Sequence, residues 1–435
     1  MSMERRDVLK RIGALSATGA VAGCLGVQEQ GEGDGTDSSS DDASGDGTAD
    51  DGSSGDTSTG TESGPAGSAT VWYSLPDTET QAREQAIESF NSNSRHTIDG
   101  GDISDLRKKT TSAIPAGQGP ASFDWAHDWV GDYAQRGFLV DQSDQLSVGM
   151  DQFTEAAAGA VQFEDQVLGL PYAAETVALV YNEEYVDEPP SSVSEMVSVM
   201  DEHHDPSNGT YGLSYPFDPY FTSAWVQSQG GYIFDPEQDP MLGLTNDATV
   251  QGLQFALDNF KPYMPNDPQY EAQAAAFADG NAAFAINGPW YLATLNEKGV
   301  DFGTAKLPSV DGGEPNPYTG IQMWYFSTGM EDDATAAAAR SFIEWHVTNE
   351  DLVLQAAEEQ GAIPVLSELA GSDELPSNVK AFSEAVQQGV PMPTHPKMNA
   401  VWEPYTSALI KAFNGDTDAA GAMEEAASTI RSNWE

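Results

Sequence analysis

The sequence predicts an α/β fold in which helices pack on sheets. Short apolar runs alternate along the chain with segments whose apolar residues recur at helical spacing, and this alternation is typical of layered α/β proteins. The 435 residues are enough for two or more domains. After residue 26 no apolar run approaches the roughly 20 residues that cross a bilayer as a helix, and no internal repeat is found.

The expected elements begin at residue 71. Val71, Trp72 and Tyr73 form a first buried strand, and the helix after it has one apolar stripe, with Thr78 and Gln81 spaced as a capping box. The other elements that we expect are a strand within 175–186, an amphipathic helix at 249–264, a strand that turns through Gly288-Pro289 into a helix within 281–295, and a helix at 334–348.

Acidic residues dominate the charge. The chain has 69 Asp and Glu residues against 18 Lys and Arg, a formal net charge of −51, whereas a magnitude of about 2–8 serves the solubility of a small domain. Such a surplus strains a compact fold by self-repulsion, which fades in molar salt because the Debye length falls to roughly 3 Å. The charge therefore indicates a protein of very salty water. An acidic tail on an ordinary protein is the alternative, but acids continue through "VDEPP" and "GMEDDAT". Nucleic acid is not expected as a partner, because no basic patch is present.

Residues 1–26 have the pattern of an export signal. Arg5 and Arg6 precede a short, weakly apolar stretch, as in a twin-arginine signal. "VAGC" resembles a lipobox, in which Cys24 is lipidated and becomes the mature N-terminus. A buried small hydrophobe is the alternative for this cysteine, the only one in the sequence. Residues 27–67 are rich in Gly, Ser, Thr and Asp and predict a disordered acidic linker, with an interaction tail as the alternative.

Motifs of enzyme chemistry are not found in the sequence, which has no G-x-S-x-G elbow, P-loop, dinucleotide-binding glycine motif or H-E-x-x-H. Asp124 and Asp128 could pair as glycosidase carboxylates, but such pairs mean little among so many acids. His203 and His204 are expected on a solvated surface rather than at a metal. Asn208 begins an N-glycosylation sequon.

Aromatic residues near Asp, Pro, Gly or Asn are the remaining signal. They are Trp125, Trp129, Tyr220, Trp290, Trp324 and Trp402. Sugar rings offer apolar faces to aromatic rings and hydroxyls to carboxylates, and such side chains are typical of a concave small-molecule site. Core packing explains any single tryptophan equally well, so these residues alone leave the choice open.

Six stretches of the chain resemble one known family. In order, they are "GQGPASFDWAHDWVGDYAQRGFLV", "LGLPYAAETVALVYNEEYV", "FDPYFTSAW", "GGYIF", "EAQAAAFADGNAAFAINGPW" and "GVPMPTHPKMNAVW". They are similar to the maltose/maltodextrin-binding proteins, the solute-binding subunits of ABC sugar importers. The resemblance implies a two-lobed, periplasmic-binding-protein-like α/β fold with a hinge and a ligand cleft between the lobes. The first lobe is expected at 68–174 and 323–360, the second at 178–317 and 365–435.

The resemblance also implies a sugar-binding site. The residues that carry over are Trp125 and Asp128 in the first lobe, Asp77 near its start, Glu175 at the hinge, and Asp218 (Glu in the family), Tyr220, Tyr270, Trp290, Met392 and Trp402 in the second lobe. Simple packing is the alternative for Tyr270 and Met392.

Three basic residues of the family are replaced in this chain by Thr78, Trp129 and Thr406. Either cations were lost from an acidic protein, or the ligand differs and needs more stacking, with Trp129 as an added stacking residue. A stacked ring contributes roughly 0.5–1.5 kcal/mol, whereas a lost charge-assisted hydrogen bond costs about 1.5–3 kcal/mol. Our hypothesis is therefore that maltose itself binds more weakly than in the parent family.

The predicted function is that of a monomeric, haloarchaeal-type lipoprotein on the extracellular face of the cell membrane. The resemblance implies that it captures maltose- or maltodextrin-like oligosaccharides by lobe closure and delivers them to the permease subunits of an ABC importer. We expect no catalysis, metal or cofactor. A secreted glycoside-processing enzyme and a surface sugar sensor on the same fold are the alternatives.

Overall fold

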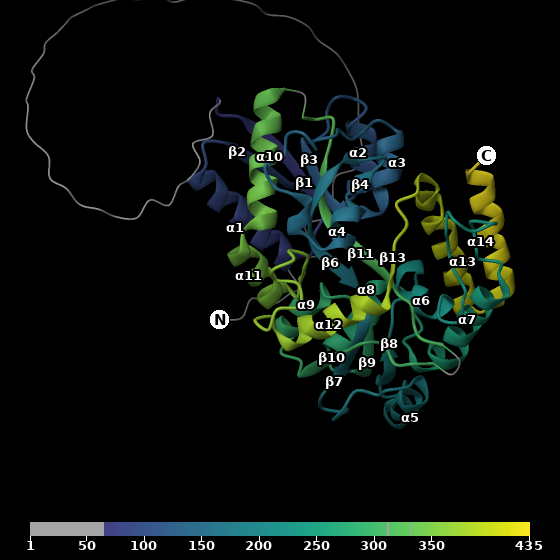
Figure 1. The fold of residues 1–435 in the computed structure, drawn as a ribbon. Helices are drawn as coiled ribbons and strands as arrows, with labels where there is room; N and C mark the ends of the chain where they lie inside the picture. Colours follow the sequence, from purple (N-terminus) through teal and green to yellow (C-terminus); the bar gives the residue numbers. More distant parts are fainter. Residues whose placement is uncertain (1–64, 311–312, 331) are drawn as a thin grey trace, which may run out of the picture. The chain divides into compact units, whose positions relative to one another are not determined.

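A computed structural model describes residues 65–310, 313–330 and 332–435. It confirms the alternation of strands and helices, and Figure 1 shows two sheets with helices around each. The predicted signal at 1–26, Cys24 and nearly all of the predicted linker lie outside the described residues. Within the described ranges, no helix combines the length and the apolar character that crossing a membrane requires.

The strands of the described residues are β1 (Ser68–Tyr73), β2 (Thr97–Asp102), β3 (Ser122–Ala126), β4 (Gln162–Phe163), β5 (Gln166–Val167), β6 (Gly169–Thr176), β7 (Ala178–Asn182), β8 (Tyr211–Ser214), β9 (Ala282–Asn287), β10 (Phe302–Ala305), β11 (Tyr318–Phe326), β12 (Ile363–Pro364) and β13 (Val390–Pro391). The α-helices are α1 (Asp77–Asn93), α2 (Leu106–Ala113), α3 (Val130–Gln135), α4 (Glu155–Ala160), α5 (Val193–His203), α6 (Pro219–Val226), α7 (Asp247–Asn259), α8 (Tyr270–Ala278), α9 (Tyr291–Lys298), α10 (Asp333–Thr348), α11 (Glu350–Gln360), α12 (Ser377–Gln388), α13 (Trp402–Asn414) and α14 (Ala419–Asn433). Short 3-10 helices lie at His127–Trp129, Met150–Gln152, Lys261–Tyr263 and Pro396–Ala400.

The larger sheet has the strand order β12-β6-β11-β3-β1-β2, and β13 pairs with β11. β1 is parallel to β2 and β3, whereas β11 is antiparallel to β3 and β6. Side chains alternate across a strand, so Val71 and Tyr73 pack into a core shared with α1 and α10. Trp72 packs on the opposite face, with residues of α2 and α3. This layering places the ends of β1 and β3 beside the start of α1.

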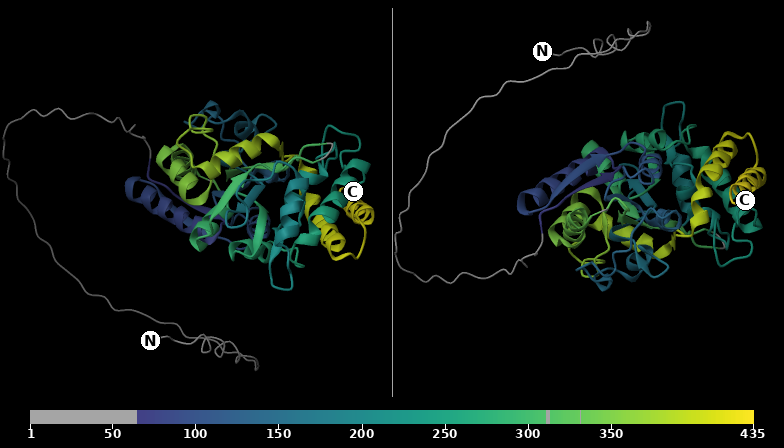
Figure 2. Two further views of the ribbon diagram at one scale, coloured as in Figure 1. Left: turned by 90° about the horizontal axis from the view of Figure 1, so that it is seen from below. Right: turned by 90° about the horizontal axis from the view of Figure 1, so that it is seen from above.

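The smaller sheet has the order β10-β7-β9-β8 and lies below the larger one in the view of Figure 1. β8 and β9 are parallel, and the other pairs are antiparallel. Phe284 and Ile286 of β9 belong to a large core that includes α13 and α14, while Ala285 packs with Phe277 and Tyr291 on the other face. Both views in Figure 2 place the C-terminal helices at the opposite end of the folded part from α1. The strand–turn–helix predicted around Gly288-Pro289 is confirmed.

The chain passes from one sheet to the other at residues 176–178. β6 ends at Thr176 in the larger sheet and β7 begins at Ala178 in the smaller one, with Val177 fully buried between them. β11 begins at Tyr318, before the predicted boundary at 323. After residue 365, Phe382 of α12 packs into the core of the larger sheet, and β13 pairs with β11. The lobe boundaries stay a prediction.

The capping box predicted at Thr78 and Gln81 is wrong. The N-cap of α1 is Pro76, and no side chain caps this helix. The proline supplies an extended backbone with φ of −56°, which places Thr78 inside the first turn, where its hydroxyl cannot act as the N-cap. The apolar stripe is confirmed, since Ala86, Ile87 and Phe90 are buried.

Candidate functional site: an aromatic and carboxylate-rich cleft

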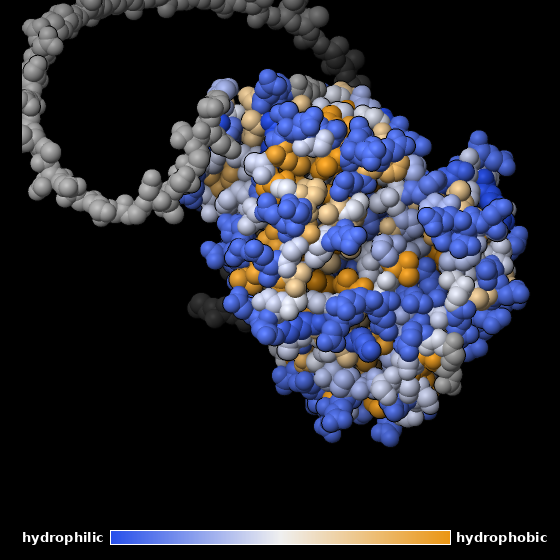
Figure 3. All heavy atoms as spheres, viewed as in Figure 1, coloured by the Kyte–Doolittle hydropathy of each residue, from blue (hydrophilic) through white to orange (hydrophobic). Residues whose placement is uncertain are grey.

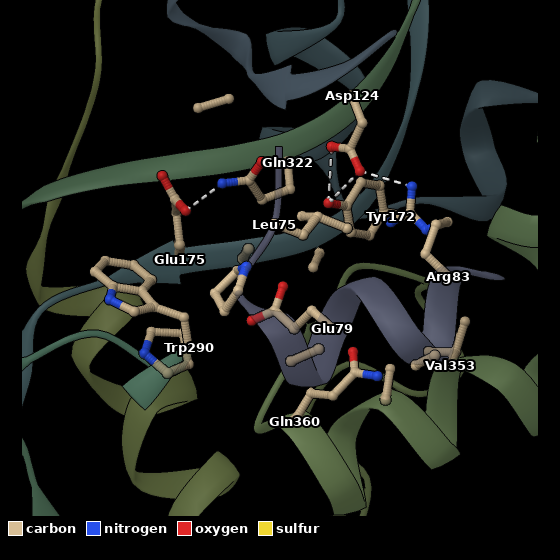
Figure 4. A pocket seen from close by; sticks show the side chains of 18 of the residues that line it. Leu75, Glu79, Arg83, Asp124, Tyr172, Glu175, Trp290, Gln322, Val353 and Gln360 are labelled. Carbon is tan, nitrogen blue, oxygen red and sulfur yellow. Dashed lines mark hydrogen bonds and ion pairs between the residues drawn. The ribbon is translucent and has the colours of Figure 1, made fainter. Parts of the chain in front are cut away.

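A cleft of about 740 Å³ is lined by strands of the larger sheet and, on the other side, by residues of α6, α8 and the turn after β9 of the smaller sheet. Five predicted site residues line it: Trp125, Glu175, Asp218, Tyr270 and Trp290. Figure 4 shows Glu175 and Trp290 at one end of the cleft and Arg83 with Val353 at the other. On the face drawn in Figure 3, apolar patches lie between hydrophilic side chains over α10 and around α11. The lining of the cleft itself combines apolar side chains such as Leu75 with a few polar groups, which is the usual composition of a small-molecule site.

Trp290 enters the cleft from the turn after β9. At Gly288 in this turn a Cβ atom would lie 2.2 Å from the indole of Trp290, so glycine leaves the ring its place. The indole Nε1–H donates to the hydroxyl of Tyr270 over 3.1 Å, and the ring of Tyr220 is 6.3 Å from that of Trp290. Because the Tyr270 hydroxyl accepts this bond, its own proton is available to a ligand.

Trp125 lies at the end of β3, half-buried, where its ring lines the cleft. Trp129 stacks on it, with ring centroids 4.8 Å apart, and Tyr133 continues the stack at 5.4 Å from Trp129. Trp129 is only 3% exposed and does not line the cleft. The guanidinium of Arg107 lies 5.5 Å from its ring. The structure therefore places Trp129 behind a cleft residue, and a contact of Trp129 with ligand stays a prediction.

Asp128 and Trp402 meet across the two parts of the fold. The indole Nε1–H of Trp402, at the start of α13, donates to Oδ2 of Asp128 over 3.0 Å. Burial raises the pKa of Asp128 to about 7, and the positive Arg107 and the bond from Trp402 oppose this rise. Neither Asp128 nor Trp402 lines the cleft. The pair links the end of β3 to the C-terminal helices.

Glu175 stands near the end of β6, at the crossing between the sheets. The side-chain amide of Gln322 donates to its Oε2 over 2.5 Å. Burial raises the pKa of Glu175 to about 7, the bond from Gln322 lowers it, and the negative charges of Asp128 and Asp124 raise it further. A sugar hydroxyl that donated to this carboxylate would stabilise its charged form.

Asp218 and Tyr220 surround the start of α6. Asp218 caps this helix by accepting from the backbone N–H groups of Tyr220 and Phe221 over 2.8 and 3.1 Å. Burial raises the pKa of Asp218 to about 6, against the effect of these two bonds. The hydroxyl of Tyr220 is buried and has no hydrogen-bond partner in the part of the chain that the structure describes. An unsatisfied buried hydroxyl is costly, so a ligand or water is expected to reach it.

The remaining predicted residues lie outside the cleft lining. Met392 is buried, and its carbonyl oxygen lies 3.0 Å from Nε2 of His127, which donates to it because Nδ1 accepts from the N–H of Ile321. Asp77 is exposed at the start of α1. The hydroxyl of Thr406 donates to the carbonyl of Trp402 within α13.

Sequence reasoning missed the inner end of the cleft. Glu79 and Arg83 of α1 point into it together with Asp124, Tyr172 and His346. Nη1 of Arg83 donates to Oδ2 of Asp124 over 2.6 Å, and the Tyr172 hydroxyl donates to the same carboxylate (Figure 4). Burial raises the pKa of Glu79 to about 7, and the nearby Asp124 adds to the rise. Glu79 and Arg83 lie four residues apart, which puts them on the same face of a helix. This spacing was the signal in the sequence that could have pointed to the pair.

Asp124 and Asp128 do not face the cleft as a pair, since Asp124 lines it and Asp128 does not. Arg83 and Tyr172 bind the first, and Trp402 binds the second. Across the described residues, no cluster of three or more His, Cys, Asp or Glu side chains is placed to hold a metal ion. His203 and His204 instead contact the rings of Tyr185 and Tyr263.

Comparison with known proteins identifies the family. A family model described as bacterial extracellular solute-binding protein matches residues 82–383. The maltotriose-binding protein of Pyrococcus abyssi is 36% identical over 345 residues, which are 78% of this chain and 75% of that protein. The chain belongs to the extracellular solute-binding proteins. It is thus a binding protein rather than an enzyme.

Two further solute-binding proteins bear on fold and ligand. The structure of the Thermus thermophilus maltotriose-binding protein with maltotriose superimposes with a TM-score of 0.77 at 26% identity, over 84% of this chain and all of that one. The galactooligosaccharide-binding protein of Bacillus subtilis is 26% identical over 73% of this chain and 77% of that protein. The predicted α/β solute-binding fold is confirmed.

Proposed function

We propose that this solute-binding protein captures a neutral oligosaccharide of the maltose/maltodextrin type in the cleft. The observation that carries the proposal is that Trp125, Glu175 and Trp290 line one cleft, the first two from strands of the larger sheet and the third from the turn after β9 of the smaller sheet. Aromatic faces pack on the C–H faces of sugar rings, and carboxylates accept hydroxyl bonds. The relative from Pyrococcus abyssi and the structural neighbour from Thermus thermophilus, both named as maltotriose-binding, support this ligand class.

Charge in the cleft favours a neutral ligand over an anionic one. Glu79, Glu175 and Asp218 line it, and the positive charge of Arg83 is met by Asp124. A uronate or sugar phosphate would bring a further negative charge into a partly desolvated space, where burial already raises the pKa of Glu79 and Glu175 to about 7 and like charges repel strongly. A neutral sugar instead offers hydroxyl donors to these groups.

Delivery follows from closure of the lobes over the ligand. Ligand contacts to both lobes stabilise a closed form. The hydrogen bond from Trp402 to Asp128 adds a direct link between the two lobes. The permease of an ABC importer then recognises the closed form. The protein acts as a monomer, is exported by the twin-arginine route and is held at the outer face of the cell membrane by a lipid on Cys24. Loss of membrane attachment in a Cys24→Ser variant, measured by fractionation, tests the anchor.

Calorimetric titration in molar KCl tests the ligand. Maltose, maltotriose, trehalose, sucrose and a galactooligosaccharide are compared, and we expect maltotriose to bind and the binding to weaken in Trp290→Ala. Absence of binding to every sugar would overturn the proposal, and nanomolar binding of maltose would refute the hypothesis of weakened maltose affinity. Preference for the galactooligosaccharide would reassign the sugar class.

Two further measurements address the role of the protein and its adaptation to salt. Unimpaired maltodextrin uptake after deletion of the protein would favour a sensor over a transport receptor. The net charge of −51 supports adaptation to high salt. We expect the melting temperature to rise when KCl is increased from 0.1 to 2 M. Sucrose added to the same osmolality should raise the melting temperature less. An equal rise in sucrose would argue against charge screening.

A further inference from the structure

The cleft extends beyond the aromatic residues, into an arm between α1 and α11. Ala82 and Ala86 of α1 and Val353 and Ala356 of α11 line the same cavity as Trp125 and Trp290. These small side chains leave space between two helices that pack against each other elsewhere. In Figure 4 Val353 lies below Arg83, at the end of the cleft away from Trp290.

Arg83 provides hydrogen-bond donors at the base of this arm. Its side chain is held by the ion pair with Asp124 and lies over the ring of Trp324, 4.4 Å from the ring centroid. A guanidinium has five N–H donors, and in the described part of the chain Asp124 and Tyr172 are the partners found for it. N–H donors of Arg83 therefore remain for a ligand, while Asp124 already balances the positive charge of the guanidinium.

His346 provides a second, uncharged donor. Its Nδ1 accepts from the indole N–H of Trp324 over 3.4 Å, so the proton of the neutral ring is on Nε2. Burial and the neighbouring Arg83 hold the pKa of this imidazole well below its usual value, which keeps the ring neutral. No hydrogen bond to Nε2 is found among the described residues, and the side chain lines the cavity.

We propose that this arm is a further subsite that binds one more neutral hexose ring of the same oligosaccharide. The apolar side chains of Ala86, Val353 and Ala356 offer contacts to the ring, Arg83 and His346 donate to its oxygens, and Glu79 accepts from its hydroxyls where the arm opens. An anionic group is disfavoured, because Asp124 already neutralises Arg83. The inference rests on the proposed function, and it adds the length of the ligand that the site recognises.

Filling the arm from either side tests the subsite. Ala82→Phe on α1 and Ala356→Phe on α11 replace half-buried alanines that line it. Ala420→Phe is the control, because Ala420 is an exposed alanine of α14. The full chain in molar KCl is titrated calorimetrically with maltose, maltotriose, maltotetraose and maltopentaose, and thermal unfolding checks that each variant is folded. If one filled variant does not fold, the other still tests the arm.

In the unaltered protein we expect the affinity to step up at one chain length, when a ring enters the arm. Both filled variants should lose that step, about tenfold in dissociation constant, while shorter ligands and the control change by less than about twofold. A step that persists in a folded filled variant, an equal loss at every length, or no step in the unaltered protein would overturn the subsite. Failure of the unaltered protein to bind any of these sugars would overturn the proposed function itself.

Discussion

The indole of Trp129 lies stacked behind that of Trp125, with ring centroids 4.8 Å apart and planes inclined by 22°. Trp125 lines the cleft, whereas Trp129 is 3% exposed and packs with Tyr133 in the core under the larger sheet. Stacked aromatic pairs hold each other in a preferred geometry. Trp129 is thus placed to fix the angle at which Trp125 meets a ligand, although the family has a basic residue at its position.

Replacing these two tryptophans should separate stability from binding. Trp129→Ala removes a buried ring, and we expect the free energy of unfolding to fall by about 3–5 kcal/mol. Trp125→Ala removes a half-buried ring from the cleft, so we expect a smaller loss of stability and a loss of ligand affinity that includes a stacking contribution of about 0.5–1.5 kcal/mol. Chemical denaturation and calorimetry measure the two effects. Unchanged stability in Trp129→Ala would contradict a packing role for this buried ring.

The bond between Trp402 and Asp128 should favour the closed form. Trp402→Phe keeps an aromatic ring and removes the donor to a buried carboxylate, whose hydrogen bonds are worth roughly 1.5–3 kcal/mol when charged. We expect weaker ligand binding and a larger radius of gyration of the ligand-free protein by solution X-ray scattering.

Trp434→Phe is the matched control for this prediction. Its indole N–H donates to the carbonyl of Lys397 on an exposed part of the surface, and Trp434 does not line the cleft. Equal affinities and equal radii for the unaltered protein and Trp402→Phe would show that the bond does not contribute to closure.

The sequence was sufficient for the fold class and for one end of the cleft. Trp125 and Trp290 could be predicted because they lie in long motifs shared with a family, and both line the cleft. Arg83 and His346 could not be predicted in the same way. They lie in helices that read as ordinary amphipathic segments, and their meeting depends on how α1 and α10 pack on the larger sheet.

Trp129 shows a second limit of sequence reasoning. It was expected as an added stacking residue because it replaces a basic residue of the family, and the contact with ligand stays a prediction. The backbone enters a 3-10 helix at His127–Trp129, and the ring packs in the core. Periodicity in a five-residue strand followed by one helical turn is too short to reveal that change of direction.

The cleft carboxyls predict a pH dependence of stability. The pKa of Glu175 is raised to about 7 from 4.5, because burial penalises its charge. The folded protein therefore binds more protons than the unfolded chain between these values, so this group's contribution is fully present below about 4.5 and is lost as pH rises through about 7. We expect Glu175→Gln to flatten this part of the stability curve and to gain relative stability at pH 8, measured by thermal unfolding from pH 5 to 8.

The exposed Glu188→Gln is the control for Glu175→Gln, since Glu188 lies in a loop after β7. Ligand binding gives an independent readout. Sugar hydroxyls that donate to Glu175 favour its charged form, so binding near pH 7 should release protons, detected by calorimetry in buffers of different ionisation enthalpy. Identical proton release by the unaltered protein and Glu175→Gln would show that this carboxyl does not meet the ligand.

The backbone at Gly320 determines where the Glu175 carboxylate lies. The two residues are paired across β11 and β6, and a Cβ atom at Gly320 would lie 2.3 Å from Oε1 of Glu175. The same Cβ would lie 2.6 Å from Cγ of Glu175, so Gly320→Ala should displace the whole side chain and its carboxylate. We expect weaker sugar binding, and thermal unfolding checks that the variant is folded. Gly159→Ala is the control, because a Cβ there meets nothing within 4 Å. Unchanged affinity in a folded Gly320→Ala would show that binding does not depend on the position of this carboxylate.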